Sequence, residues 1–265
     1  MGHFLRDNLS SLTINEIKAY LFSKEELSAR ELSILKSDQR KGVQKLLSSF
    51  LKQREKARSE EEHLHKLMAK ERLLHEQGYE LIAGADEAGR GPLAGPVVAA
   101  AVILDPGKNC WAGINDSKQL APQAREELYE IVTANAKAVA IGVADVPLID
   151  EINIYHASLR AMRLAVEKLL PQPDYVLFDG FNVPGVDLPQ EAVIGGDALC
   201  LSIAAASIVA KVTRDKIMLE YDREYPGYGF DRNKGYSTAE HREAIKTLGL
   251  SPIHRRTFQC YKEDR

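Results

Sequence analysis

The pattern of hydrophobic positions changes along the chain near residue 79. Before this point, apolar side chains recur every three or four residues, which is the spacing of one face of an α-helix; the clearest run is Leu46, Leu47, Phe50 and Leu51. A polar stretch over residues 52–62 leads to a second amphipathic segment, and Gly78 suits the end of its helix because glycine readily adopts the conformation that follows helices. Residues 1–78 are therefore expected to be helical throughout.

Four segments have the spacing of a capping box. In this motif a Ser or Thr is followed three residues later by Glu, and each side chain accepts a hydrogen bond from the other residue's backbone N–H. The four segments begin at Thr13, Ser23, Ser28 and Ser237. We expect a helix to begin directly after each of them.

Beyond residue 79, short apolar runs typical of buried strands alternate with helical patterns. Strands are expected over residues 79–86, 97–104, 138–145, 175–179 and 192–196, and helices over residues 122–134, 154–170, 199–224 and 237–248. The segment between the first two strands is too short for a crossover helix, so these strands should form an antiparallel hairpin. The pattern predicts an α/β fold, a mixed sheet covered by helices, preceded by a small N-terminal helical domain.

The composition is that of an ordinary globular protein, with 45% hydrophobic and 28% charged residues over 265 positions. This length accommodates one large domain and one smaller one, which we place at residues 73–265 and 1–72. The net charge of −3 gives no sign of a strongly basic nucleic-acid-binding protein. The charge is uneven, however, because residues 1–78 hold 15 basic and 12 acidic side chains against 20 and 26 in the remainder.

The cysteines and the apolar segments indicate the compartment. Cys110, Cys200 and Cys260 are odd in number and show no zinc-ligand spacing, which favours a reducing cytosol. The N-terminal residues do not resemble a signal peptide, and the longest apolar run, residues 199–212, is too short to span a bilayer. We expect a soluble, cytoplasmic protein.

Acidic residues stand at the ends of three expected strands. Asp86 and Glu87 end the first strand, Asp179 ends the fourth and Asp197 follows the fifth. Unpaired charges beside a core lose hydration, so packing alone does not explain them, whereas strands that converge on divalent metal ions do. Oxygen-only ligands favour magnesium or manganese over zinc. Because adjacent strand residues face opposite ways, Asp86 and Glu87 serve one site only if the strand ends at Asp86 or if Glu87 also supplies its backbone carbonyl.

Each of these features also has a simpler interpretation. Asp179 begins an Asp-Gly pair, which is common in turns, and Asp197 could cap the helix expected from residue 199. The glycines of residues 89–95 could merely permit a tight turn, and they do not form a dinucleotide-binding loop because a strand follows them. Two glycines around Arg90 nonetheless favour a loop that closely approaches a phosphate-bearing ligand.

Four motifs together resemble the ribonuclease HII family. They are Asp86-Glu-Ala-Gly-Arg-Gly91, Asn115-Asp-Ser-Lys118, Gly196-Asp197 with the helical sequence of residues 201–215, and Lys234-Gly-Tyr-Ser-Thr-x-x-His241. The resemblance covers about Glu80 to Tyr261. It implies a ribonuclease H-like fold and hydrolysis of RNA in RNA–DNA hybrids, including cutting at single ribonucleotides embedded in duplex DNA. It would place the protein in ribonucleotide excision during DNA replication and repair.

The resemblance also implies roles for individual residues. The four acids Asp86, Glu87, Asp179 and Asp197 would be catalytic and would hold two divalent ions, Mg²⁺ or Mn²⁺, in a reaction that leaves 5′-phosphate and 3′-hydroxyl ends. The substrate-binding residues of the family are matched by Gly89, Arg90 and Gly91 at the ribonucleotide, by Tyr236 at the RNA–DNA junction and by Lys118 at a phosphate. Residues 1–72 resemble the N-terminal extensions of some bacterial members, and we expect a monomer with no membrane partner.

Further side chains are given modest roles. His241 is expected to cap, pack or touch phosphate rather than to act as a general base. Ser202 and Ser207 belong to a group of small residues that should let a helix pack closely, and support of the metal-binding acids by a serine near Asp197 is the lesser alternative.

Three alternative functions remain open. The chain could be a different metal-dependent phosphodiesterase or nuclease with the same fold, for example one that cuts structured DNA. It could be a ribonuclease HIII, although the N-terminal domain of that type should show strands. It could also be a catalytically silent nucleic-acid-binding protein, but four carboxylates near a phosphate backbone would bring binding no benefit.

A basic stretch lies in the N-terminal region. Residues 36–58 contain eight basic and two acidic side chains. Such a run is either a solvated helix face or an arm that binds the phosphates of a duplex.

Overall fold

The computed structural model describes residues 9–258, so Cys260, Tyr261 and the first residues of the chain lie outside the described part. The chain divides between His63 and Leu64 into two compact units, which are considered separately. None of the helices within residues 9–258 combines the length and the apolar character needed to cross a membrane.

The first unit is built from helices around a small core. A 3₁₀ turn, Leu9–Ser11, is followed by α1 (Ile14–Phe22), α2 (Ala29–Ser37) and the first part of α3 (Lys41–Leu67). The buried side chains of this core are Ile17, Leu21, Leu35, Val43, Leu47 and Phe50. Helix α3 runs without a break through the polar stretch of residues 52–62, as expected for a connecting helix.

Two of the capping boxes in this unit are confirmed and one is wrong. Thr13 caps α1 and Ser28 caps α2, each in a reciprocal pair with the Glu three residues later. Ser23 instead ends α1, where its hydroxyl donates to the carbonyl of Tyr20 at 2.8 Å. The chain then turns before Ser28 starts the next helix, so no helix begins at Ser23.

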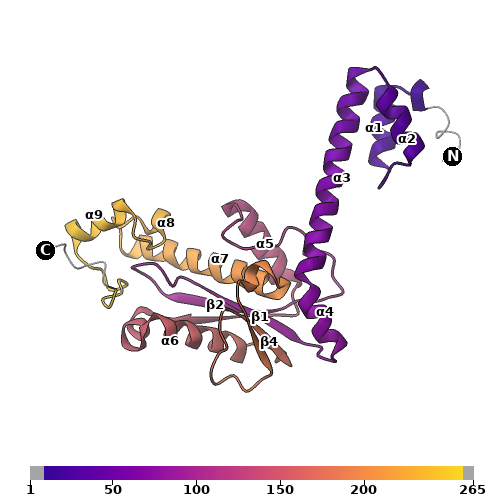
Figure 1. Ribbon diagram of the computed structural model, residues 1–265. Helices are drawn as coiled ribbons and strands as arrows, with labels where there is room; N and C mark the ends of the chain where they lie inside the picture. Colours follow the sequence, from indigo (N-terminus) through magenta and orange to yellow (C-terminus); the bar gives the residue numbers. More distant parts are fainter. Residues whose placement is uncertain (1–8, 259–265) are drawn as a thin grey trace. The chain divides into compact units, whose positions relative to one another are not determined.

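The second unit contains a five-stranded mixed sheet in the order β3-β2-β1-β4-β5 (Figure 1). The strands are β1 (Ile82–Ala88), β2 (Val97–Ile103), β3 (Ala138–Ala144), β4 (Tyr175–Asp179) and β5 (Gln190–Val193). β1 pairs antiparallel with β2, which confirms the expected hairpin, and β2 pairs antiparallel with β3. β4 lies parallel to β1 and to β5, so the sheet is mixed as predicted.

Helices cover both faces of this sheet (Figure 1). α6 (Val146–Glu167) packs on one face, and α7 (Leu201–Glu224) with α5 (Pro122–Asn135) covers the other. The remaining helices are α4 (Ala69–Glu76), the 3₁₀ turn η2 (Gly196–Ala198), α8 (Phe230–Asn233) and α9 (Ala239–Leu248). Helix α4 ends just before Gly78, whose φ of +96° is the left-handed conformation expected there.

Two helix starts in this unit differ from expectation. α9 is capped by Thr238, whose side chain accepts from the N–H of His241, so the predicted start at Ser237 is one residue early. α6 begins at Val146 after an Asp145 cap and is interrupted at Asn153, which has non-helical angles. The expected helix from residue 154 is therefore only the second part of α6.

Helix α7 approaches β1 so closely that only glycine fits at position 84. A Cβ atom added to Gly84 would lie 2.2 Å from the carbonyl carbon of Ser202. We expect Gly84→Ala to lower the free energy of unfolding by about 1–3 kcal/mol, because the backbone of α7 would have to shift. Urea unfolding followed by circular dichroism measures this change.

Gly91→Ala is the matched control for this prediction. The Cβ of that variant would meet only the Tyr236 ring, at an ordinary contact distance of 3.8 Å. Equal unfolding midpoints for the Gly84 variant and the wild type would show that α7 is not held at this distance in solution.

Candidate active site

The first two acids lie on opposite faces of β1. The strand continues to Ala88, so the expectation that it ends at Asp86 is wrong. Ala85 packs in the core beneath α6 and Ala88 packs in the core beneath α7. Because side chains alternate along a strand, Asp86 faces α7 and Glu87 faces α6. Both residues pair with β2 and lie near the end of β1.

Asp179 lies next to Asp86 at the end of the neighbouring parallel strand. The last registered pair of β1 and β4 is Ala85 with Phe178, and Asp86 and Asp179 are the residues that follow this pair. Leu177, two residues before Asp179, packs with Ile203 of α7, which places the Asp179 side chain on the same face as Asp86. Asp179 Oδ1 also accepts a hydrogen bond from the N–H of Gly196 at 2.7 Å, which ties β4 to the turn that carries Asp197.

The fourth acid, Asp197, is paired with Lys118. The Lys118 Nζ atom lies 3.2 Å from Asp197 Oδ2. The Asn115–Lys118 segment presents this lysine in a turn in which Asp116 Oδ1 accepts from the N–H of Lys118 at 2.9 Å. Asp197 does not cap α7, whose N-cap residue is Cys200, so the simpler interpretation of Asp197 is wrong.

The four acids are electrostatically linked. Burial raises the pKa of Asp86 well above its usual value, and the charges of Glu87 and Asp179 raise it further. Burial also raises the pKa of Glu87, against the lowering effect of Arg90, and the pKa of Asp179, against the hydrogen bond from Gly196. Bringing negative charge together in a poorly hydrated place costs free energy that a bound cation offsets.

The donor chemistry of the cluster therefore fits a divalent cation, since every acid offers carboxylate oxygen. Within the part of the chain that the structure describes, no three His, Cys, Asp or Glu side chains are close enough together to hold one ion. The carboxylates instead bond to protein groups: Asp197 to Lys118, Glu87 to Arg90 and Asp179 to the Gly196 N–H. Ion binding would require some of these side chains to exchange partners.

The loop after β1 lies beside both an acid and an aromatic ring. Arg90 Nη1 is 3.3 Å from Glu87 Oε1. Gly89 has a φ of +99°, and a Cβ atom there would lie 2.1 Å from Arg214 Nε, so only glycine suits the position. Gly91 lies next to the ring of Tyr236, which is 44% exposed. The structure thus brings the predicted substrate-binding residues to the same end of the sheet as the acids.

Two buried arginines that sequence reasoning missed hold this loop in place. Arg214 donates to the carbonyls of Ala94, Pro96 and Lys234, at 3.0–3.1 Å. Arg255 donates to several loop carbonyls, among them that of Arg90 at 2.9 Å. One signal was available, because Arg214 follows Ser207 by seven residues and therefore shares its face of α7.

Ser207 contacts the acid cluster directly, in addition to packing. A hydrogen bond from its side chain lowers the pKa of Asp86 against the effect of burial. Its Oγ also lies 2.8 Å from the Oγ of Ser117, in the Asn115–Lys118 segment. These contacts favour a supporting role for Ser207 beside the acids, in addition to packing.

His241 belongs to a buried chain of hydrogen bonds that ends at Tyr236. The N–H of Ser251 donates to His254 Nδ1, so neutral His254 carries its proton on Nε2 and donates to His241 Nε2 at 3.0 Å. The proton of His241 then lies on Nδ1 and faces the carbonyl of Tyr236 at 2.9 Å. Burial lowers the pKa of both histidines, to about 4 for His254, which keeps the pair neutral near pH 7. His241 is thus buried, which agrees with the expected packing role, and in addition it holds the backbone carbonyl of Tyr236.

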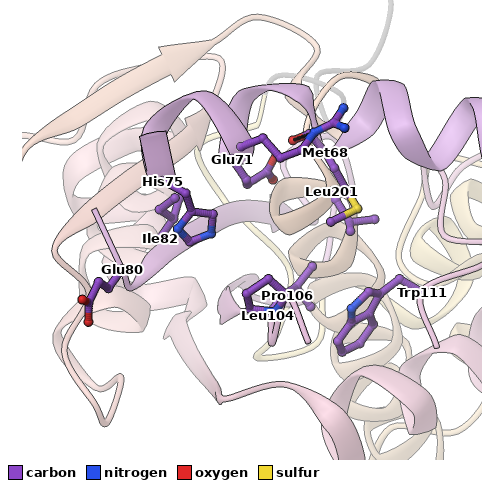
Figure 2. Close-up of a pocket in the computed structure, with 10 residues that line it drawn as sticks. Met68, Glu71, His75, Glu80, Ile82, Leu104, Pro106, Trp111 and Leu201 are labelled. Carbon is purple, nitrogen blue, oxygen red and sulfur yellow. Dashed lines mark hydrogen bonds between the residues drawn. The ribbon is translucent and has the colours of Figure 1, made fainter. Parts of the chain in front are cut away.

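A hollow lies near the start of α7 (Figure 2). None of the predicted site residues lines it; its walls include Met68, Glu71, His75, Trp111 and Leu201. Glu71 Oε1 accepts hydrogen bonds from the N–H and the hydroxyl of Ser202, so α4 supplies a cap to α7. The hollow is a product of this docking of α4 and has no part in the candidate chemistry.

A mixed sheet whose central strands end in linked carboxylates, beside a glycine loop and basic side chains, defines a metal-dependent phosphodiester hydrolase with a ribonuclease H-like fold. The family model described as ribonuclease HII matches residues 83–261, and that of the ribonuclease HII N-terminal domain matches residues 13–75. The chain belongs to the ribonuclease HII family. As a member it is a metal-dependent endoribonuclease that degrades RNA in RNA–DNA hybrids.

Curated relatives and solved structures agree with this placement. The chain is 47% identical to a ribonuclease HII of Bacillus licheniformis over 96% of its own length and 99% of the relative's. It is also 47% identical to a ribonuclease HII of Enterococcus faecalis, over 95% of its own length and 98% of the relative's. The ribonuclease H2 of Pyrococcus horikoshii matches with a TM-score of 0.59 and 29% identity, over 68% of this chain and 94% of that one.

A more distant structure has the same fold. Bst-RNase HIII, solved in complex with Mn²⁺, matches with a TM-score of 0.50 and 23% identity, over 66% of this chain and 65% of that one. At this identity the likeness concerns the fold alone.

Proposed function

We propose that this enzyme cuts the RNA strand of RNA–DNA hybrids and also cuts at single ribonucleotides embedded in duplex DNA, leaving 5′-phosphate and 3′-hydroxyl ends. The observation that carries this proposal is the position of the glycine loop and Tyr236. The loop Gly89–Gly91, which would recognise one nucleotide, contacts Glu87 through Arg90 and lies beside Tyr236. An enzyme that degraded nucleic acid without regard to the sugar would not need it.

In this proposal Asp86, Glu87, Asp179 and Asp197 hold two divalent ions, Mg²⁺ or Mn²⁺. Bound there, the ions would activate a water molecule and stabilise the leaving oxygen of the phosphodiester. The protein groups orient this arrangement: Ser207 and the Glu87 N–H bond to Asp86, and the Gly196 N–H bonds to Asp179. Lys118 and Arg90, released from their acids, would meet the phosphates.

The loop Gly89–Gly91 would read the sugar. The RNA-specific 2′-hydroxyl lies in a wide, shallow minor groove, where backbone groups can reach it. Arg214 and Arg255 hold the loop carbonyls rigidly, which preserves the geometry that such reading needs. Tyr236 would stack on the sugar or base at the RNA–DNA junction.

The rival functions fit less well. The residues described between 9 and 76 form helices and no strands, and the N-terminal family model is that of ribonuclease HII, which argues against ribonuclease HIII. Family membership in an enzyme class argues against a silent binding protein. A nuclease for structured DNA would share the acids but has no use for a ribose-reading loop.

A substrate panel tests the proposal. Three labelled duplexes, all-DNA, RNA–DNA hybrid and DNA with one ribonucleotide, are incubated with enzyme and Mg²⁺ or Mn²⁺, and with EDTA as the control. The proposal expects metal-dependent cleavage of the second and third only. Cleavage of the all-DNA duplex at a comparable rate would support the rival nuclease instead.

We further propose that the protein works as a monomer in the cytoplasm, in ribonucleotide excision during DNA replication and repair. Two cysteines of the described part, Cys110 and Cys200, are free thiols, which suits a reducing compartment. The proposed substrate, a ribonucleotide within DNA, arises where DNA is copied.

The N-terminal unit is proposed to bind the duplex through a row of lysines on α3. Lys41, Lys45, Lys52 and Lys56 are exposed and lie within about 60° of one another around the helix, which turns 100° per residue. Within residues 9–258 these four lysines form no hydrogen bond or ion pair, whereas Arg40, Arg54 and Arg58 are bonded to Asp38, the Lys24 carbonyl and Glu62. The lysines are therefore available for phosphates.

Replacing these four lysines with glutamine is expected to raise the Michaelis constant about tenfold at low salt and to leave the saturated rate within about threefold. The slope of log affinity against log salt should become shallower by about 3.6, because each of the four phosphate contacts contributes about 0.9. Cleavage kinetics at several salt concentrations measure both quantities. The same four positions changed to arginine, which keeps the charge, should behave like the wild type.

Removal of the whole unit should have the same effect, provided that the cut is made at residue 63. Deletion through residue 72 would also remove Glu71, which caps α7. Unchanged substrate affinity in both the truncated enzyme and the glutamine variant would show that this unit is not a nucleic-acid arm.

A further inference from the structure

Two exposed aromatic rings beside the acid cluster have no role in the proposed cleavage reaction. Tyr155 and Phe181 are 40% and 42% exposed. Their ring centroids are 5.4 Å apart, and the rings meet edge to face at 85°. Exposed aromatic side chains that form a contiguous patch mark places where a partner binds, because burying them from water is favourable.

Local hydrogen bonds fix the backbone at both aromatic residues. Phe181 follows Asp179 by two residues, and its N–H donates to the carbonyl of Asp179 at 2.9 Å. Tyr155 begins the second part of α6, where Asn153 caps the helix by accepting from the N–H groups of Tyr155 and His156. Asn153 has a φ of +68°, a conformation that costs free energy for a residue other than glycine. This strained cap fixes the backbone at Tyr155, where the second part of α6 begins.

Arg90 connects the two rings to the loop that would read the sugar. Its guanidinium carbon lies 5.7 Å from the centre of the Phe181 ring, while its Nη1 contacts Glu87. On the other side of Arg90, Gly91 lies next to Tyr236. Tyr236, the loop, Phe181 and Tyr155 thus follow one another along the end of the sheet where the acids lie.

We propose that Tyr155 and Phe181 form an aromatic subsite for the sugar of a nucleotide that flanks the one held at Gly89–Gly91. This inference rests on the proposed function. A sugar is the fitting ligand because the bases of a duplex are stacked inside it, whereas its sugars line the shallow minor groove that the loop would read. Phe181 follows Asp179 by two residues and its ring contacts Arg90, so a second protein on this pair would compete with the substrate.

The proposed subsite makes binding depend on the length of the duplex. A substrate track with Tyr236 at one end and the Tyr155–Phe181 pair at the other contacts nucleotides on both sides of the ribonucleotide. Shortening the duplex one base pair at a time should therefore weaken binding sharply at the length where the nucleotide on this pair is lost. Removal of the aromatic pair should abolish that step.

Single-turnover cleavage in Mg²⁺ tests this on a series of duplexes that carry one ribonucleotide and are shortened from either end. It gives the half-saturating enzyme concentration and the maximal rate separately. With the longest duplex, Phe181→Leu and Tyr155→Leu should each raise the half-saturating concentration about tenfold, with the maximal rate within about threefold of wild type. Both variants should lack the step. Melting followed by circular dichroism checks the fold of each variant. If one leucine variant fails to fold, the other one alone tests the subsite.

The controls separate ring stacking from other effects. Tyr155→Phe and Phe181→Tyr keep a ring and should keep both the affinity and the step. Phe22→Leu removes an aromatic side chain that is 73% exposed in the first unit and should also keep the step. Wild-type behaviour of both leucine variants, or a step that persists in them, would overturn the subsite. A wild-type enzyme that cuts no ribonucleotide-containing duplex would overturn the proposed function itself and the subsite with it.

Discussion

Replacing Asp86 with asparagine is expected to lower the saturated rate of cleavage by at least about a thousandfold, because several kcal/mol of charge stabilisation by the bound ions would be lost. Asp86 lies at the centre of the cluster: it adjoins Glu87 in β1, registers beside Asp179 and bonds to Ser207. Duplex binding should remain, since the loop, Lys118 and Tyr236 are unchanged. Cleavage at saturating Mg²⁺ and binding by fluorescence anisotropy measure the two effects.

The stability of this variant distinguishes lost chemistry from a lost fold. Burial raises the pKa of Asp86, so the wild-type carboxyl is neutral at low pH and gains a costly buried charge as the pH rises. A raised pKa in the folded state means that stability is lost as the pH rises through that pKa. Asparagine carries no charge, so in EDTA the variant should melt at or above the wild-type temperature, by a margin that grows with pH.

Asp187→Asn is the matched control, because Asp187 is an exposed aspartate outside the cluster. It should leave both the rate and the melting temperature unchanged. Substantial activity of the Asp86 variant at saturating Mg²⁺ would contradict the role of Asp86 as a metal ligand.

Tyr236→Ala is expected to lower kcat/KM about 10- to 100-fold on a duplex with one ribonucleotide, because stacking on an aromatic ring contributes roughly 1–3 kcal/mol. Tyr236 is 44% exposed and its ring lies beside Gly91, while its backbone carbonyl is held by His241. Substitution should therefore remove the stacking surface without disturbing the fold. The concentration of Mg²⁺ that gives half-maximal activity should not change, since Tyr236 is not a ligand.

Tyr236→Phe separates stacking from hydrogen bonding by the phenol. If stacking is the main contribution, this variant should retain most of the wild-type kcat/KM. Cleavage kinetics of Tyr236→Ala that equal those of the wild type would show that Tyr236 is only a structural residue.

The parts of the fold that depend on local pattern could be predicted from the sequence. The β1–β2 hairpin followed from a connection too short for a helix, and β4 was predicted with its observed bounds. The acids were found because a charge at the end of an apolar run is conspicuous. Ser23 was misjudged because it has the same spacing to a glutamate as Thr13 and Ser28, and only the following turn decides which serine starts a helix.

The parts that depend on distant contacts could not be predicted. Arg214 and Arg255 donate to backbone carbonyls more than a hundred residues away. The spacing that puts Arg214 on the same face of α7 as Ser207 does not indicate which carbonyls it meets. Asp86 and Glu87 face opposite sides of the sheet because β1 keeps pairing with β2 beyond them, and the sequence does not show where this pairing stops. Likewise, the sequence showed a basic run over residues 36–58, but only the structure distinguished the arginines that have partners from the four lysines that have none among residues 9–258.

The most direct test of the account is to map the cut in a DNA duplex with one ribonucleotide at single-nucleotide resolution. The substrate is labelled on the ribonucleotide-containing strand, incubated with wild-type enzyme and Mg²⁺, and its product ends are identified by their response to phosphatase and ligase. The account predicts one metal-dependent cut at the ribonucleotide, with a 5′-phosphate and a 3′-hydroxyl. Cuts scattered along the DNA, or a 2′,3′-cyclic phosphate end formed without metal, would contradict it.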